Sequence, residues 1–209
     1  MTSKLIGALK GLDDLMTEEE NLSLKICLLG DNAVGKTSLI RKYAYDIFDD
    51  SYIPTMGMKV IKDISIEMQE YDKKYNITFW IYDTMGDANY RDLLNGSNLS
   101  GLSGAFLVCD VTRPETLENL IFWADSLYKE CDENIPIIYM ANKSDLTGGQ
   151  IFDLADMERL TEVFKAPWLL TSARTGDNVE KAFRILGMKM IKNYLRNIGS
   201  DLPRNAERL

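Results

Sequence analysis

The sequence has no histidine, and it lacks an excess of basic residues. Its 209 residues include 24 Lys and Arg against 32 Asp and Glu, which gives a formal net charge of −8. A nucleic-acid-binding domain needs a basic face, so this balance argues against nucleic acid as a partner.

Cysteine is scarce, and long apolar runs are absent. Cys27 and Cys109 lie inside short apolar runs and are expected to be buried, whereas Cys131 follows a predicted helix. Nothing in their spacing indicates a zinc site or a disulfide framework. No apolar run approaches the roughly 18 residues that span a bilayer, and no signal-peptide pattern opens the chain. These absences favour a reduced, cytoplasmic protein.

The length fits one domain with short appendages. Residues 1–23 carry a helical apolar stripe followed by acidic residues, and residues 199–209 read as a flexible tail. We expect the stripe to pack on the domain or on a partner, and membrane contact is the less favoured alternative. Oligomeric state has no clear signal, and a monomer is the simplest expectation.

Between these ends, residues 24–198 alternate strand-like and helix-like segments. Such alternation predicts an α/β fold with a six-stranded, mostly parallel sheet and helices on both faces. A hairpin turn at Asp72-Lys73-Lys74 would add one antiparallel edge strand. Ligands of such sheets bind beyond the carboxyl ends of the strands. The predicted strands are 24–29, 58–68, 75–82, 105–109, 135–141 and 168–170, and the predicted helices are 36–46, 114–130, 153–164 and 179–198.

The segment from Gly30 to Thr37 matches the phosphate-binding pattern G-x-x-x-x-G-K-[ST] between a strand and a helix, as in the P-loop NTPase fold. Its glycines allow successive N–H groups to curl around a phosphate, Lys36 adds a fixed positive charge, and Thr37 offers a hydroxyl to Mg²⁺. The expected phosphate-binding residues are Gly30, Asp31, Asn32, Ala33, Val34, Gly35, Lys36, Thr37 and Ser38.

A second motif, Asp83-Thr84-Met85-Gly86, closes the strand at 75–82. Asp83 can hold a magnesium-bound water, and Gly86 lets a backbone N–H reach the γ-phosphate. The pattern is weak alone, because Asp and Gly are common turn residues, but its place after a strand supports the assignment.

The third motif, Asn142-Lys143-Ser144-Asp145, selects the base. Guanine presents N1–H and an exocyclic amine side by side, and the Asp145 carboxylate can accept both. Adenine offers no such pair, so a site built on that carboxylate rejects it. A backbone N–H of Thr171-Ser172-Ala173 can donate to the guanine O6.

Together, the segments GDNAVGKT, Pro54-Thr55, DTMGD, NKSD and TSA resemble the small GTPases, nearest to the Rab and Ras branches, over about residues 24–198. The resemblance implies binding of GTP/GDP with Mg²⁺. It also implies that Thr55 binds Mg²⁺ in the triphosphate state, that Phe48 lies against the guanine ring, and that Ser172-Ala173-Arg174 forms the last guanine-contacting loop. It further implies that effectors, exchange factors and GTPase-activating proteins act through the switch regions.

The sequence departs from this family where a glutamine should follow Gly86, because residue 87 is Asp87. The family glutamine orients the attacking water, whereas a carboxylate beside the γ-phosphate is either held back by repulsion or used as a weak base. Residues 47–57 contain no arginine that could help in its place. We therefore expect Lys36, Thr55, Gly86 and Asp87 to support only slow hydrolysis of GTP.

Two other functions remain open at this point. The chain could be a binding module that holds GTP with little hydrolysis, or, less well supported, a P-loop kinase of a small metabolite, which NKSD and TSA argue against. Lipid anchors of two kinds are not expected, because no cysteine follows Cys131 and Thr2 stands where myristoylation needs glycine.

Overall fold

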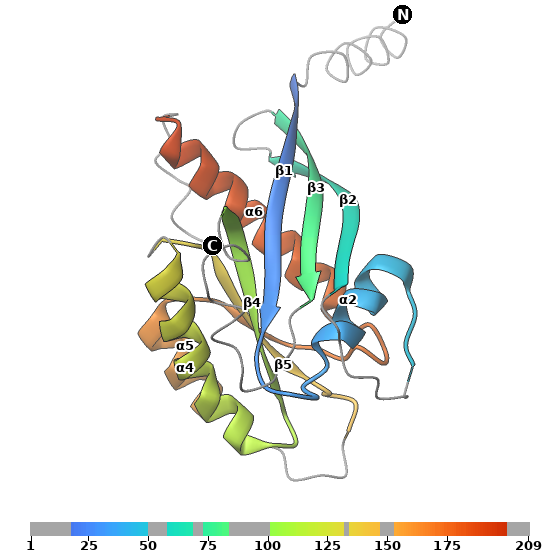
Figure 1. Ribbon diagram of the computed structural model, residues 1–209, viewed down its shortest axis with the longest axis vertical. Coiled ribbons are helices and arrows are strands. Elements are labelled where there is room, and N and C mark those ends of the chain that lie inside the picture. Colours follow the sequence, from blue (N-terminus) through green and yellow to red (C-terminus); the bar gives the residue numbers. More distant parts are fainter. Residues whose placement is uncertain are drawn as a thin grey trace, which may run out of the picture.

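The computed structural model describes residues 18–49, 58–68, 73–83, 101–131, 134–146 and 153–199. Within them, six strands form one sheet in the order β2-β3-β1-β4-β5-β6, with four helices around it (Figure 1). In chain order the elements are β1 (Glu18–Leu29), α2 (Lys36–Tyr45), β2 (Met58–Met68), β3 (Lys73–Asp83), β4 (Leu102–Asp110), α4 (Pro114–Glu130), β5 (Ile137–Asn142), α5 (Leu154–Phe164), β6 (Trp168–Leu170) and α6 (Val179–Asn197).

Only the β2–β3 pairing is antiparallel, and β2 is an edge strand; the other four pairings of the sheet are parallel. The predicted mostly parallel sheet with one antiparallel edge strand is thus confirmed. Because β1, β3, β4, β5 and β6 run in the same direction, their carboxyl ends meet at one edge of the sheet. The polar motifs of the sequence follow these ends.

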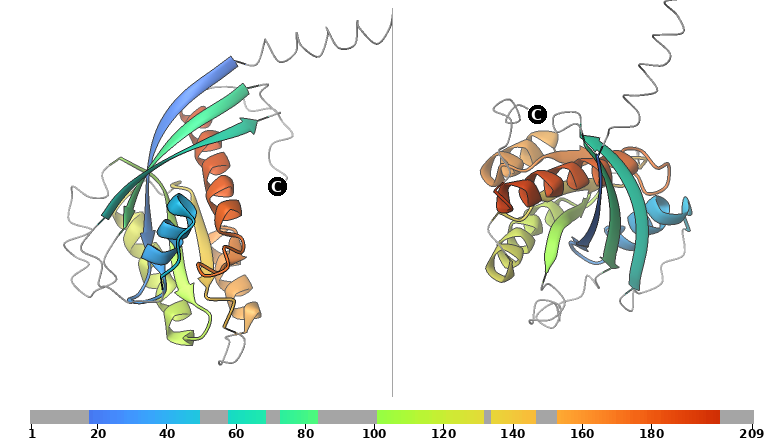
Figure 2. Two further views of the ribbon diagram at one scale, coloured as in Figure 1. Left: turned by 90° about the vertical axis from the view of Figure 1, so that its right-hand side faces the viewer. Right: turned by 90° about the horizontal axis from the view of Figure 1, so that it is seen from above.

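The two faces of the sheet carry two separate apolar clusters. In β1, Ile26 and Leu28 point to one cluster while Cys27 and Leu29 point to the other, as the two-residue period of a strand requires. Helices α2 and α6 cover the first face and α4 and α5 cover the second, so helices flank both sides as predicted (Figure 2).

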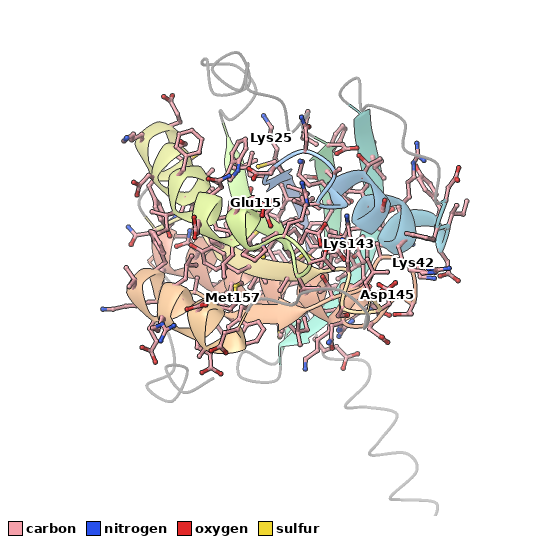
Figure 3. All side chains as sticks on the ribbon, turned by 90° about the horizontal axis from the view of Figure 1, so that it is seen from below. Lys25, Lys42, Glu115, Lys143, Asp145 and Met157 are labelled. Atoms are coloured by element: carbon pink, nitrogen blue, oxygen red, sulfur yellow. The ribbon has the colours of Figure 1, made fainter. Side chains whose placement is uncertain are left out.

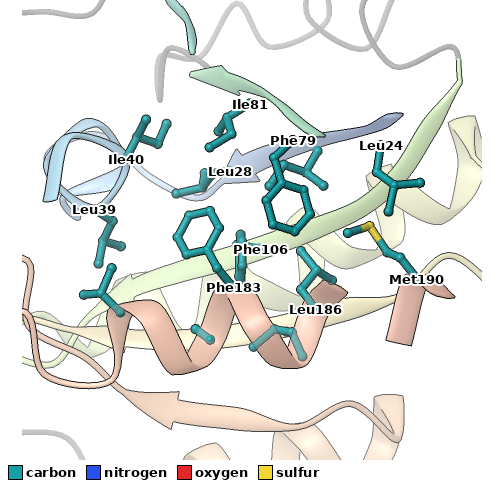
Figure 4. Packing of buried hydrophobic residues seen from close by; sticks show 14 of the residues in the cluster. Leu24, Leu28, Leu39, Ile40, Phe79, Ile81, Phe106, Phe183, Leu186 and Met190 are labelled. Atoms are coloured by element: carbon teal, nitrogen blue, oxygen red, sulfur yellow. The ribbon is translucent and has the colours of Figure 1, made fainter. Parts of the chain in front are cut away.

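Phe183 of α6 lies at the centre of the first cluster (Figure 4). Its ring stacks on Tyr43 with centroids 3.7 Å apart and contacts Phe106 at 4.6 Å and Phe79 at 6.3 Å. Burying one such side chain stabilises a fold by about 1.5–3 kcal/mol. This packing joins α2, which begins at the phosphate-binding loop, to the sheet and to α6.

Three strands begin earlier than the sequence predicts, and one of them is β4, which begins at Leu102 rather than residue 105. β1 begins at Glu18 rather than residue 24, so residues 18–23, which we assigned to the N-terminal extension, belong to the sheet. β3 begins at Lys73, so Lys73 and Lys74 are strand residues and not part of the hairpin turn, while Asp72 lies outside the described residues. The length added to β1 and β3 is mostly polar, and cross-strand pairs such as Lys74 with Glu19, whose Nζ and Oε1 lie 2.8 Å apart, support it.

The first residues of β1 lie beside the last turns of α6. The Tyr194 hydroxyl hydrogen-bonds to the Glu20 carboxylate, which raises the pKa of Tyr194. β4 pairs with β1 only from Lys25 onward, whereas β3 pairs with it from Glu18. The start of β1 and the end of α6 therefore lie together at the edge opposite the carboxyl ends (Figure 1).

The buried thiols match an expectation from the sequence. Cys27 and Cys109 are buried and unbridged, and Cys131 is half-buried just after α4. Among the helices described, none has the combination of length and apolar character that a membrane crossing requires.

Candidate functional site

The loop from Gly30 to Thr37 connects β1 to α2, and its two glycines are required by geometry. Gly30 has φ +140°, and a Cβ there would lie 2.1 Å from the Val108 carbonyl oxygen. Gly35 has φ +101°, and a Cβ there would lie 2.3 Å from Nδ2 of Asn142. Any other residue would be strained at both positions, so the backbone can follow this path only with glycine.

Lys36 begins α2 and is almost fully buried, with 6% of its surface exposed. Its ammonium donates to the backbone carbonyls of Gly30 at 2.7 Å and Asp31 at 2.8 Å. Burial lowers its pKa to about 8, although the nearby carboxylates of Asp83 and Asp31 oppose that shift. The loop thus encloses the Lys36 ammonium with too little negative charge around it to compensate for its burial. A bound phosphate would supply that charge.

Asp83, the last residue of β3, faces the same loop. It is 4% exposed, and neither carboxylate oxygen has a hydrogen-bond partner in the described part of the chain. Burial raises the pKa of Asp83, against the opposing influence of the nearby Thr37 hydroxyl and of Lys36. A buried carboxylate with two unsatisfied oxygens is costly, and a hydroxyl beside it completes a hard oxygen donor set. The pair fits a Mg²⁺ ion or its bound water.

Asn142, which ends β5, joins the phosphate-binding loop to the base-binding loops. Its side-chain amide donates to the Val34 carbonyl at 2.8 Å. Its Oδ1 accepts from the Ala173 backbone N–H at 3.2 Å and from the Thr171 hydroxyl at 3.4 Å. The Ala173 N–H, which belongs to the segment expected to donate to guanine O6, therefore already has a partner, and donation to a base would need that bond to be shared or exchanged.

Asp145 and Ser172 form the core of the base-binding part. The Ser172 hydroxyl donates to the Asp145 carboxylate at 2.6 Å and accepts the Thr175 N–H at 3.1 Å, which fixes its orientation. The Ser144 backbone N–H donates to the Thr171 carbonyl at 3.1 Å, so the two loops are also joined by main chain. Figure 3 shows Lys143 and Asp145 together at the edge where the strands end.

Asp110, at the end of β4, is a buried acidic residue that sequence reasoning missed. Its carboxylate pairs with Lys143 at 2.6 Å and with Arg113 Nε at 3.1 Å, and it accepts the Thr112 N–H and hydroxyl. Burial acts to raise the pKa of Asp110, but Lys143 and Thr112 outweigh it and hold the pKa below its usual value. Lys143 therefore points to Asp110, and this ion pair connects the base motif to the turn before α4.

That turn and α4 contact the tip of the phosphate-binding loop, which no local motif indicates. Arg113 donates to the Asn32 carbonyl at 2.8 Å. The Asp31 carboxylate accepts from Asn119 Nδ2 at 2.7 Å and from Trp123 Nε1 at 2.9 Å. The Asp31 side chain thus faces α4, and only its backbone is left for the phosphate cradle. These partners lie more than 80 residues away along the chain.

The remaining predicted residues have mixed placements. Phe48 is partly buried against the first apolar cluster, Val34 is buried in that cluster, and Ser38 is half-buried in the first turn of α2. Ala33 and Arg174 are exposed. Thr55, Gly86 and Asp87 lie outside the described residues, as do the segments expected to form the switches.

The described site thus brings the loop at 30–37, Asp83, the 142–145 motif and the 171–174 loop to one edge of the sheet. Residues 25–192 match a family model described as "Ras: Ras family".

Proposed function

Because this chain belongs to the Ras family, it is a small GTPase, and we propose that it binds GTP and GDP through the residues described above and switches between two states. The phosphates would lie in the cradle of loop amides with Lys36, and guanine would be selected by Asp145. Its sequence motifs resemble those of the Rab and Ras branches most, which supports a role in signalling or intracellular trafficking.

One observation carries the assignment of the site. The Asn142 amide bonds to Val34 of the phosphate-binding loop and to Ala173 of the base-binding loop, at 2.8 Å and 3.2 Å. A phosphate grip and a base-selecting carboxylate are thus fixed relative to each other within one buried hydrogen-bond set. A rigid spacing between the two is what recognition of a whole nucleotide needs, because pre-organised groups lose less entropy on binding.

For the metal, Asp83 and Thr37 are the residues that would hold Mg²⁺, joined by Thr55 when the triphosphate is bound. Bound there, the ion would neutralise charge on the β- and γ-phosphates. The unpaired Asp83 oxygens support this role, because a bound cation or its water would satisfy them. The same binding would favour the ionised form of a carboxyl whose pKa burial now raises.

For hydrolysis, Lys36 and the backbone amides around Gly86 would stabilise the charge that develops on the γ-phosphate. Asp87 would orient water poorly, because it is negatively charged and one methylene shorter than glutamine. We therefore propose slow intrinsic hydrolysis that a GTPase-activating partner speeds up. Effectors and exchange factors would act through the switch regions of a cytoplasmic monomer.

Single-turnover hydrolysis with purified protein tests the rate. We expect unaided turnover below about 10⁻² per second, the rate of a GTPase with its own arginine in place. Asp87→Gln should hydrolyse GTP faster, since it restores a neutral group that can orient water. A wild-type rate at or above that value would contradict the role given to Asp87.

Identification of the nucleotide that copurifies with the protein tests the binding function itself. Guanine nucleotide with Mg²⁺ is expected. Retention of ATP with no preference for GTP would overturn the proposal, and equal hydrolysis rates near zero for the wild type and Asp87→Gln would favour a binding module instead.

A further inference from the structure

We propose that helix α4 is a brace for the phosphate-binding loop and that, through Asp31, it slows the release of nucleotide. This inference rests on the proposed function, since it names residues that control how long the site keeps its ligand. None of these residues belongs to the motifs that bind phosphate, base or metal, apart from Asp31 itself.

The contact is built from two side chains on one face of α4. Asn119 and Trp123 are four residues apart, so they project from the same side of the helix. Asn119 donates to one Asp31 oxygen at 2.7 Å, and Trp123 donates to the other at 2.9 Å. The carboxylate is therefore held at both oxygens, which fixes its orientation and not only its position.

The Trp123 end of this contact is rigid. The indole is 5% exposed and belongs to the second apolar cluster, between α4 and the sheet. Its N–H is thus presented by a side chain that cannot move without disturbing the core. Hydrogen bonds to a charged acceptor are also stronger than neutral ones.

The neighbouring loop residue is held from the same helix. Arg113 is the N-cap residue of α4, and its guanidinium donates to the Asn32 carbonyl while Nε pairs with Asp110. Two successive residues at the tip of the loop are thus tied to one helix. Because Lys36 donates to the Asp31 carbonyl, the brace also fixes an acceptor that orients the phosphate-binding ammonium.

Asp31 is better explained as a tether than as a ligand to nucleotide or metal. Its two oxygens already have donors, and a carboxylate repels phosphate. An acidic residue in a phosphate-binding loop lowers the affinity for nucleotide, because its charge has the same sign as that of the phosphates. The neutral donors on both Asp31 oxygens hold this carboxylate toward α4. The geometry assigns this residue to holding the loop.

The test is the rate at which a fluorescent GDP analogue leaves the full-length protein with Mg²⁺ present. Asn119→Ala removes one donor, and Trp123→Phe removes the other while it keeps most of the buried ring. Glu118→Ala is the matched control, since Glu118 is the exposed neighbour on α4. We expect each brace variant to release GDP about tenfold faster, which corresponds to about 1.4 kcal/mol, and the control to release it at the wild-type rate.

A double-mutant cycle separates bracing from loss of helix stability. In an Asp31→Ala background both acceptors are gone, so Asn119→Ala and Trp123→Phe should change the rate less than about twofold. Unchanged release when either substitution is made in the wild-type protein, or an equal increase in the wild-type and Asp31→Ala backgrounds, would overturn the brace.

A second readout does not depend on nucleotide. Hydrogen exchange of the amides at residues 30–35 in nucleotide-free protein should be faster in Trp123→Phe than in Glu118→Ala. If the wild type kept no guanine nucleotide, the proposed function would fail while this measurement still tested the brace, and equal exchange in the two variants would refute it.

Discussion

The phosphate-binding and base-binding parts of the site lie at the same edge of one sheet, but they are held in different ways. The base-binding loops hold each other through Ser172 with Asp145 and through the Ser144 N–H with the Thr171 carbonyl. The tip of the phosphate-binding loop is held from outside, by α4 and the turn before it. Base selection should therefore depend on few residues, whereas the phosphate grip depends on the fold around it.

This difference separates specificity from retention. A change inside the base-binding loops should alter which purine is accepted and leave the phosphate cradle intact. A change in the supports of the phosphate-binding loop should weaken the binding of any nucleotide. Three experiments test the contrast.

The largest effect is expected from Asp145→Asn. The amide can present a donor where guanine needs an acceptor, so affinity for GDP should fall about 10³-fold, which is roughly 4 kcal/mol. Affinity for xanthosine diphosphate should rise, because xanthine has a carbonyl where guanine has its amine, and the amide can donate to it. Competition binding with both nucleotides checks this.

Ser172→Ala is the control for that change, because it removes the hydroxyl that orients the carboxylate but keeps the carboxylate itself. Its loss of GDP affinity should be smaller, with guanine still preferred. Unaltered guanine preference in Asp145→Asn would show that another group selects the base.

The next effect concerns the backbone of the phosphate-binding loop. Gly30→Ala would place a Cβ 2.1 Å from the Val108 carbonyl oxygen at φ +140° and should destabilise the protein by about 3 kcal/mol. Gly101→Ala has a positive φ of 71° but meets no atom within 4 Å, so it should cost only about 1 kcal/mol. Urea unfolding measures both. Equal losses would mean that the close approach to β4 is relieved at no cost.

The smallest effect is a pH dependence that comes from Lys36. Its pKa of about 8 lies below the ordinary value of 10.5, so the charged form that binds phosphate is lost as pH rises through 8. Affinity for GDP should fall by about tenfold per pH unit once that pKa is passed.

Stability should change in the opposite direction over the same range. A lowered lysine pKa means that the unfolded chain binds more protons between about pH 8 and 10.5, so the stability of the nucleotide-free protein should rise with pH there. Lys36→Met should remove both dependences. Binding titrations and urea unfolding at pH 7 and 9 measure the two slopes, and slopes of the same sign would contradict the assignment.

The sequence predicted the fold well because it depends on local patterns. The short apolar run at 24–29 and the apolar stripes of α4 and α6 each indicate an element without reference to the rest of the chain. Among the wrong boundaries, those at β1 and β3 fall where most of the added strand residues are polar. Those residues are in the sheet because of partners across it, such as Glu19 and Lys74, which a single segment does not reveal.

The site residues also differ in whether local sequence was enough to predict them. Contiguous motifs indicated Lys36, Asp83 and Asp145, because each group's chemistry depends on its neighbours in sequence. Asp110, Asn119 and Trp123 could not be predicted, because their partners are distant along the chain and an acidic strand end or a buried tryptophan has many ordinary explanations. Arg113 lies far from residues 47–57 in sequence, and it reaches the phosphate-binding loop from the N-cap of α4.

The Tyr194–Glu20 contact joins the last turns of α6 to the start of β1. The start of β1 and the end of α6 are adjacent and define one pole of the described domain. The twelve residues of β1 separate that pole from Gly30 by about 40 Å, at about 3.3 Å per residue. A partner that bound this pole would leave the edge that carries Gly30 accessible to nucleotide.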